Sequence, residues 1–408
     1  MGLRIAVAGA GGFARDFLPL FAAHPGVEEV SLAELLPDRR AQVAAEFGIR
    51  RTFASHEDAC AAADVDAVAI MTQRHLHGPQ AIATLEAGKH VWSAVPMGTD
   101  ATEIGRILAL AAEHRLVYMS AETSWYYPDV VFARARHAEG AFGEIVYAEG
   151  SYLHDMSQGF YEAFQRSGGT DWRRVAGVPP MYYATHSLSS VLSVTGGRPV
   201  SVSCLGWADR SDDLVFGAGR NLWDNPFSNQ TALFRTSDGA SVRINEFRRV
   251  GWSGRISELP MAIYGTRAVF AEHATGQVWT DLDGHVEDLT ERLAFPMDIG
   301  YAPAARPVDE TDAPRRYAPV QRWQRLPRAF WSQRNMHLGS HQFLVDDFVK
   351  AVTSGRLPPV SAWEAARFAL AGITAHESAL QDGERLQVPD PGEPPADWAR
   401  LDPEEATP

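Results

Sequence analysis

The sequence predicts a two-domain α/β protein, in which a parallel sheet with crossover helices precedes a large, mostly antiparallel sheet. At 408 residues, the chain exceeds the roughly 250 to 300 residues at which single hydrophobic cores stop growing. From Leu3, short apolar runs alternate with longer helical patterns, which is typical of a parallel sheet. After about Ser120 the pattern becomes strand after strand, separated by turn signals. The two halves of the chain are therefore expected to contain different kinds of sheet.

The elements of the first half can be placed in order. Buried strands are expected at residues 3–8, 27–34, 65–71 and 90–93, with a helix at 80–87. We place the first domain at residues 1–121.

The second half contains five expected strands. They lie at residues 144–153, 200–208, 231–235, 241–247 and 261–269. The turn Ser237-Asp238-Gly239 separates two of them and favours a hairpin. This pattern predicts an α+β domain with an antiparallel open sheet.

The C-terminal part returns to helical periodicity. An irregular surface loop is expected at 303–327, followed by helices at 341–353 and 362–380. We place the second domain at 122–388. The acidic, proline-rich residues 389–408 are expected to form a loose tail or an arm on a neighbouring subunit.

Composition excludes several classes of partner. The net charge is −14, so general attraction to nucleic acid or an anionic membrane is not expected. Cys60 and Cys204 are too few for a disulfide framework, which suits a reducing cytosol, and no apolar run approaches the length of a membrane span. We therefore expect a cytoplasmic protein.

A glycine-rich turn after the first expected strand carries the first chemical signal. Gly9-Ala10-Gly11-Gly12-Phe13-Ala14 opens a helix, as in dinucleotide-binding Rossmann domains. Glu34 ends the second strand about 20 residues later, where a carboxylate bonds the ribose hydroxyls and repels a 2′-phosphate. NAD is therefore the expected cofactor, although Arg39 and Arg40 nearby moderate the preference over NADP.

The ordered phrases of the chain resemble the Gfo/Idh/MocA oxidoreductase family. They are the glycine-rich turn at residues 9–14, the run from Val65 to His77, the phrase Leu85-Glu86-Ala87-Gly88-Lys89-His90-Val91, and the phrase Gly355-Arg356-Leu357-Pro358-Pro359 before a long helix. The resemblance implies a Rossmann domain, an open-sheet domain, NAD, a sugar or cyclitol substrate and a homo-oligomer, a dimer or tetramer. It implies cofactor contacts at Gly9, Gly11, Gly12, Phe13, Ala14, Glu34, Thr72, Arg74, His77, Ala94, Val95 and Pro96.

One motif departs from the family pattern. Dehydrogenases of this family typically show Glu-Lys-Pro, whose lysine helps to move the proton of the reacting alcohol. Here the corresponding residues are Ala94, Val95 and Pro96. The chain therefore needs another proton carrier.

His186 is the expected base. The family usually has an aspartate and a histidine four residues apart, and this chain has Tyr182 and His186. Glu122 and His154 are further catalytic candidates, although Glu122 could instead cap a helix and His154-Asp155 could be a surface turn. No catalytic metal is expected.

Aromatic and basic residues suggest how a substrate is held. Two arginine pairs beside aromatics, Arg173-Arg174 and Arg248-Arg249, could bind an anionic group, or could be solvated or salt-bridged surface residues. The expected substrate-binding residues are Tyr183, Asp155, Trp172, Arg173, Arg174 and Arg248.

Three functions remain open. The first is an NAD-dependent glycosidase that oxidises carbon 3 of a sugar transiently, eliminates the group at carbon 1, adds water and returns the hydride. Glycosidase branches of the family resemble this chain in lacking the lysine, and an anionic sugar such as a sulfoquinovoside is one candidate substrate. The second is a sugar or inositol dehydrogenase. The third is a non-catalytic NAD-binding regulator.

Overall fold

A computed structural model describes residues 2–252, 254, 257–273, 276–295 and 316–402. The chain forms two compact units. Unit 1 contains residues 1–126, 295–366 and 391–408, and unit 2 contains residues 127–294 and 367–390. This division differs from the expected boundaries, because the described residues 316–366 belong to the N-terminal unit.

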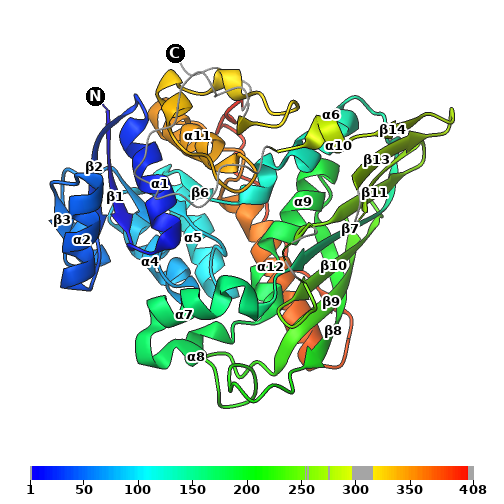
Figure 1. Ribbon diagram of the computed structural model, residues 1–408, viewed down its shortest axis with the longest axis horizontal. Helices are drawn as coiled ribbons and strands as arrows, with labels where there is room; N and C mark the ends of the chain where they lie inside the picture. The colour runs from blue at the N-terminus through cyan, green and yellow to red at the C-terminus, as the bar shows by residue number, and fades with distance from the viewer. Residues whose placement is uncertain (1, 253, 255–256, 274–275, 296–315, 403–408) are drawn as a thin grey trace. The chain divides into compact units, whose positions relative to one another are not determined.

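Unit 1 is built on a six-stranded parallel sheet with the order β3-β2-β1-β4-β5-β6. This is the strand order of a Rossmann fold. Its strands are β1 Leu3–Ala8, β2 Val27–Ala33, β3 Thr52–Phe53, β4 Ala67–Ile70, β5 His90–Ser93 and β6 Tyr118–Ser120. Strands β1, β2 and β3 are labelled in Figure 1. Every residue of β4 is buried, as expected for a strand covered on both faces.

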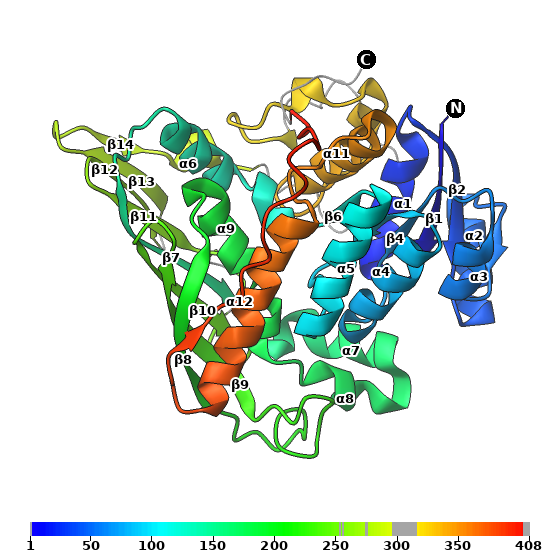
Figure 2. The same ribbon diagram turned by 180° about the vertical axis from the view of Figure 1, so that it is seen from behind.

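The helices of unit 1 have recognisable local signals. Pro37 stands at the start of one helix and Gly48, in the left-handed region, follows its end. Ser55 and Asp100 accept backbone hydrogen bonds as N-caps of two others. The helices are α1 Gly12–Ala23, α2 Pro37–Phe47, α3 His56–Ala61, α4 His77–Glu86 and α5 Ala101–His114, and α4 and α5 lie side by side (Figure 2).

Later parts of the chain complete unit 1. They include the 3₁₀ turns η7 Trp323–Arg325 and η8 Arg328–Ser332 and the helix α11 Ser340–Ser354, which packs against α1. Most of the irregular loop expected at 303–327 lies outside the described residues.

The expected loose tail is instead docked on its own chain over its described residues. The Leu357 N–H donates to the Ala399 carbonyl, and the Leu401 N–H donates to the Leu357 carbonyl. Trp398 Nε1–H donates to the Gly355 carbonyl at 3.0 Å. Trp398 and Leu401 are buried. The prediction of a loose tail was wrong because these two apolar side chains anchor an otherwise polar segment.

Unit 2 contains a nine-stranded sheet with the order β14-β13-β12-β11-β7-β10-β9-β8-β15. All pairs are antiparallel except β7 with β10, so the expected mostly antiparallel sheet is confirmed. The strands are β7 Ile145–Leu153, β8 Pro199–Ala208, β9 Phe227–Thr236, β10 Ser241–Phe247, β11 Met261–Gly265, β12 Ala268–His273, β13 Gly276–Asp281, β14 Val286–Asp288 and β15 Leu386–Gln387. The single strand expected at 261–269 was wrong: the chain turns after Gly265 and makes two strands.

Helices cover one face of this sheet. The helix α9 packs on β7, β10 and β11, beside α6 (Figure 1). Gly150 of β7 permits this approach, because an added Cβ would lie 2.6 Å from the Ser187 carbonyl of α9. The helices are α6 Pro128–Ala138, α7 Tyr161–Gly168, α8 Trp172–Ala176, α9 Thr185–Thr195, α10 Thr290–Leu293 and α12 Ala362–Leu380, whose first residues fall in unit 1.

Candidate functional site

The glycine-rich turn of unit 1 is shaped for a dinucleotide. Gly9 has φ +102°, and an added Cβ would lie 2.4 Å from the Met71 carbonyl, so a side chain is excluded there. A Cβ at Gly11 or Gly12 would meet no described atom within 4 Å, so these glycines leave an open face where α1 begins. Unsatisfied N–H groups at a helix start favour an anion, so the turn fits the pyrophosphate of NAD.

Glu34 lies directly beside this turn. Its Oε2 accepts from the Ala10 N–H at 3.1 Å and its Oε1 from the Leu36 N–H at 3.0 Å. Arg40 donates to the Glu34 carbonyl at 2.7 Å, and Arg39 comes within 3.9 Å of Oε2. The carboxylate is therefore held at the end of β2, with two arginines close by.

The segment Ala94-Val95-Pro96 follows β5 and is buried. Its position is fixed by His77, whose ring nitrogens lie 2.8 Å from the Pro96 carbonyl and 3.2 Å from the Thr72 carbonyl. Burial lowers the pKa of His77 to about 4, so the ring is neutral and its single N–H donates to one of these two carbonyls. His77 therefore holds two loops in place, and its geometry supports a positioning role more than contact with the cofactor.

Thr72 and Arg74 stand in the loop after β4. Thr72 Oγ1 donates to Gln80 at 2.5 Å, and Arg74 begins a short 3₁₀ turn, η1 Arg74–Leu76. Their contacts with NAD remain predictions.

Unit 2 gathers six polar and aromatic residues that we name the acid–base cluster. His186 stands in the first turn of α9, with the ring of Tyr152 5.3 Å away and that of Tyr183 5.1 Å away. The cluster consists of Tyr152, Tyr183, His186, Glu246, Arg248 and Glu258.

A buried ion pair lies within the acid–base cluster. Arg248 Nη2 donates to Glu246 Oε2 at 2.7 Å, and its guanidinium lies 4.7 Å from the centre of the Tyr152 ring. Ser187 donates to the other oxygen of Glu246 at 2.5 Å. Burial raises the pKa of Glu246 to about 7, although Arg248 and Ser187 oppose that rise.

Glu258 is the second carboxyl group of the acid–base cluster. Its carbonyl accepts from the Leu153 N–H at 2.8 Å, which places it at the end of β7 beside Tyr152. Burial raises the pKa of its carboxyl group, and the charges of His186 and Arg248 oppose the rise. The side chain of Glu258 is only half-buried and is accessible to solvent, whereas Glu246 is fully buried.

The other expected catalytic residues have different surroundings. His154 adjoins the cluster, since its ring stacks on Tyr152 at 5.6 Å. Tyr182 lies in a 3₁₀ turn (η5 Pro180–Tyr183) before α9, and its ring meets His376 at 5.2 Å. Tyr182 and His186 therefore lie in different elements, although they are four residues apart in the sequence. Glu122 belongs to unit 1 and accepts from the N–H and hydroxyl of Ser124, which supports the capping interpretation.

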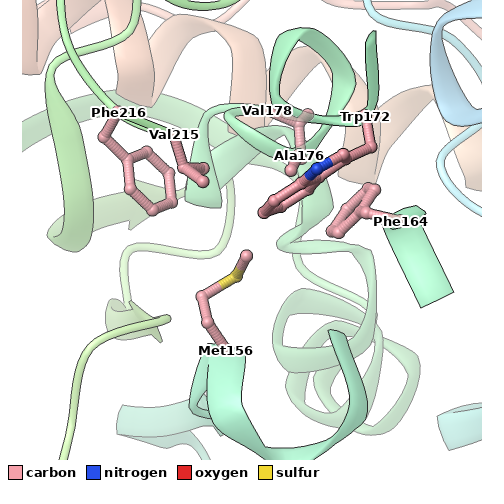
Figure 3. Close-up of a cluster of buried hydrophobic side chains, with 7 residues drawn as sticks. All are labelled: Met156, Phe164, Trp172, Ala176, Val178, Val215 and Phe216. Atoms are coloured by element: carbon pink, nitrogen blue, oxygen red, sulfur yellow. The ribbon is translucent and has the colours of Figure 1, made fainter. Parts of the chain in front are cut away.

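Two expected substrate-binding residues are engaged in the fold. Asp155 accepts from the Ser157 N–H and hydroxyl and from the Val250 N–H, as a turn residue does. Trp172 is buried in an apolar cluster (Figure 3). The members of this cluster are Met156, Phe164, Trp172, Ala176, Val178, Val215 and Phe216.

The four arginines separate into different roles. Arg173 and Arg174 are exposed on α8, and Arg173 donates to the Asp213 carbonyl at 2.9 Å. Arg249 is bonded to Tyr161 and Asp213. Only Arg248 belongs to the acid–base cluster, where Glu246 balances its charge.

Sequence reasoning missed Tyr152, Glu246 and Glu258. A signal existed for Glu246, because Val242, Ile244 and Glu246 alternate on the buried face of β10. A carboxylate at an apolar position of a strand predicts a buried partner. Glu258 follows an irregular segment and had no comparable signal.

The described residues also bear on metal binding and on membrane insertion. Among the described residues, no three His, Cys, Asp or Glu side chains are grouped to hold a metal ion. Over those same ranges, no helix combines the length and apolar character needed to cross a bilayer.

Comparison with known proteins defines the class. Residues 3–122 match the family model of NAD-binding Rossmann-fold oxidoreductases, and residues 130–271 match the GFO/IDH/MocA C-terminal domain. The chain is therefore an NAD-dependent enzyme with a dinucleotide-binding domain. It belongs to the Gfo/Idh/MocA family.

Individual relatives add detail. A glycosyl hydrolase family 109 protein of Streptomyces niveus is 25% identical, over 95% of this chain and 77% of its own length. An alpha-N-acetylgalactosaminidase of Bacteroides fragilis is 31% identical over 33% of this chain and 32% of its own. A levoglucosan dehydrogenase in complex with NADH and levoglucosan has the same fold, with a TM-score of 0.71 at 20% identity over 96% of this chain and all of its own.

Proposed function

We propose that the protein is an NAD-dependent glycoside hydrolase that acts by transient oxidation, elimination, hydration and re-reduction. The observation that carries the proposal is the buried, apolar Ala94-Val95-Pro96 in place of a lysine, together with an acid–base cluster in unit 2. A dehydrogenase that lacks its lysine still needs one base, whereas elimination needs a second group to move a proton at carbon 2. The family 109 relatives over most of the chain support this reading.

The residues of the acid–base cluster would divide the proton transfers. Bound NAD would remove a hydride from carbon 3 and later return it, so that carbon 3 is briefly a ketone. His186 would take the hydroxyl proton at carbon 3 and give it back at the end. Glu258 would remove the proton from carbon 2 and pass it to the oxygen that leaves carbon 1. Water would then add at carbon 1 by the reverse of this transfer, which makes the overall reaction a hydrolysis.

The electrostatics of the cluster favour an uncharged substrate. One guanidinium faces two carboxyl groups, and Arg248 already pairs with Glu246 at 2.7 Å. A sulfonate would therefore have to compete with Glu246 for the guanidinium of Arg248. The rings of Tyr152, Tyr183 and His154 suit the apolar face of a sugar. We therefore favour a neutral glycoside over the anionic sugar considered from the sequence.

A net dehydrogenase is the second candidate. A trans-1,2-dihydrobenzene-1,2-diol dehydrogenase of Mus musculus is 27% identical over half of this chain, and sugar and inositol dehydrogenases share the fold. In this alternative His186 alone would replace the missing lysine.

One assay separates the two candidates. The purified protein is incubated with a panel of nitrophenyl glycosides and, separately, with free sugars and NAD. Release of nitrophenol without accumulation of NADH is expected. NADH that accumulates with a free sugar, without glycoside cleavage, would overturn the hydrolase proposal in favour of the dehydrogenase.

A further inference from the structure

A pair of histidines in unit 1 packs on the first turns of α1. His341, in the first turn of α11, lies with Nε2 2.8 Å from Nδ1 of His337, and the two rings are stacked at 4.7 Å. Phe13 meets both rings edge-on, at 6.0 Å from His337 and 5.6 Å from His341. Phe13 is the residue that follows the open glycines of the cofactor turn, so the histidine pair borders that turn.

The backbone that carries His337 is strained and held in place. His337, Leu338 and Gly339 have φ values of 47°, 51° and 89°, all in the left-handed region. Gln321 donates to the Leu338 carbonyl at 2.7 Å, and Asn335 donates to the Gly339 carbonyl at 2.6 Å. Non-glycine residues in this region cost free energy, and such strain gathers at functional sites.

The proton positions of the pair follow from burial. His341 is fully buried, and burial holds its pKa well below the usual value, so the ring is neutral. Its Nδ1 is buried without a hydrogen-bond partner among the described residues, so a proton there would be an orphaned donor. The proton of His341 therefore belongs on Nε2, where it is donated to His337 Nδ1. His337 then carries its own proton on Nε2, and this side chain is exposed.

The charged side chains near the start of α1 compensate one another. Arg15, the arginine of this part of α1, is bound to Glu46 at 2.5 Å. Asp16 on α1 is largely buried, which raises the pKa of its carboxyl group to about 6, and the charge of Arg334 opposes that rise. The group that this segment adds at the start of α1 is therefore the exposed N–H donor of His337.

We propose that His337 binds the pyrophosphate of the dinucleotide through a hydrogen bond from Nε2–H, beside the backbone N–H groups of the glycine turn. His341 and Phe13 are positioning residues, which hold the ring and its tautomer. This inference rests on the NAD-binding domain and not on the proposed hydrolase activity, so glycoside assays do not decide it.

The test measures binding rather than turnover. The apo forms of the wild type, His337→Ala and His337→Gln are titrated with NAD, ADP-ribose and adenosine by calorimetry. His337→Ala should raise the Kd of NAD and of ADP-ribose about tenfold, which corresponds to ~1.4 kcal/mol, and leave adenosine unchanged. His337→Gln retains an N–H donor and should recover part of the affinity. His114→Ala, an exposed histidine of α5, is the matched control and should behave as the wild type.

Two results would overturn the inference. One is an unchanged Kd for NAD and ADP-ribose in His337→Ala. The other is an equal loss for adenosine, because that would show a general distortion of unit 1 and not a lost contact with phosphate. Melting temperatures of the apo variants establish that each one is folded, and His337→Gln supplies the comparison if the alanine variant does not fold.

Discussion

His186 lies in the first turn of a buried helix, with its ring 5.3 Å from that of Tyr152 and 5.1 Å from that of Tyr183. We expect His186→Ala to lower kcat about 10²- to 10⁴-fold, since it removes a general base. NAD affinity should stay near the wild-type value, because the glycine turn belongs to the other unit. Steady-state kinetics and NAD titration measure both quantities. His285→Ala, an exposed histidine of unit 2, is the control, and an active His186→Ala enzyme would transfer the base to another residue.

Glu34 is the carboxylate that we expect to set the preference for NAD over NADP. Glu34→Ala removes the group that repels a 2′-phosphate and leaves Arg39 and Arg40 beside the turn. NAD should bind more weakly and NADP more tightly than in the wild type. Calorimetric titration with both nucleotides checks this, and tighter binding of NADP than of NAD by the natural protein would contradict the assignment.

Glu246 should make stability depend on pH. Its pKa is raised from 4.5 to about 7, so the folded protein binds more protons than the unfolded chain between these values. Stability therefore falls as pH rises through this window. Glu246→Gln should reduce the difference in unfolding free energy between about pH 5 and about pH 8 by on the order of 1 to 3 kcal/mol. Denaturation of both proteins at the two pH values measures it, with exposed Glu113→Gln as the control. An identical pH dependence in Glu246→Gln would show that Glu246 stays ionised.

At the scale of elements, the approach of α9 to β7 builds the acid–base cluster. In Gly150→Ala, the new Cβ would lie 2.6 Å from the Ser187 carbonyl, so α9 and His186 must shift. We expect a loss of about 1 to 3 kcal/mol of stability, together with lower kcat. Gly105→Ala is the matched control, because its Cβ meets no described atom within 4 Å in the helix α5, and it should stabilise by about 0.5 to 1 kcal/mol. Equal thermal denaturation of the two variants would disprove the packing argument.

The strand patterns of both sheets were predictable from local sequence, because apolar alternation and turn residues act over a few positions. The bounds of β1, β5, β10 and α12 agree with the expected ranges. The turn after Gly265 was missed, although Gly265, Thr266 and Arg267 interrupt the apolar run within residues 261–269. The parallel pairing of β7 with β10 joins distant segments and had no local signal.

At the scale of the whole molecule, a hydrolase that oxidises and reduces its substrate in one cycle produces no net NADH. The hydrogen at carbon 2 should exchange with solvent if Glu258 removes it as a proton, as we propose. Turnover of an active glycoside in deuterated water should therefore place deuterium at carbon 2 of the released sugar. Mass spectrometry of that sugar measures it. Direct displacement by paired carboxylates would leave carbon 2 untouched, so cleavage with neither exchange nor an isotope effect would exclude elimination.

The sequence by itself determined the cofactor turn and the missing lysine. Gly9, Gly11 and Gly12 satisfy constraints on φ and on close approach that arise within a few residues, so the turn can be read locally. Ala94, Val95 and Pro96 show the absence of an ammonium group directly.

Only the tertiary structure decided which polar groups work together. Tyr152, His186, Arg248 and Glu258 come from four separate segments, and their proximity depends on strand register and on helix packing. Tertiary packing also buried Trp172 in an apolar cluster and paired Arg248 with Glu246. In unit 1 it placed Trp398 against the Gly355 carbonyl. Burial and charge pairing arise from contacts across long sequence separations, which no local pattern encodes.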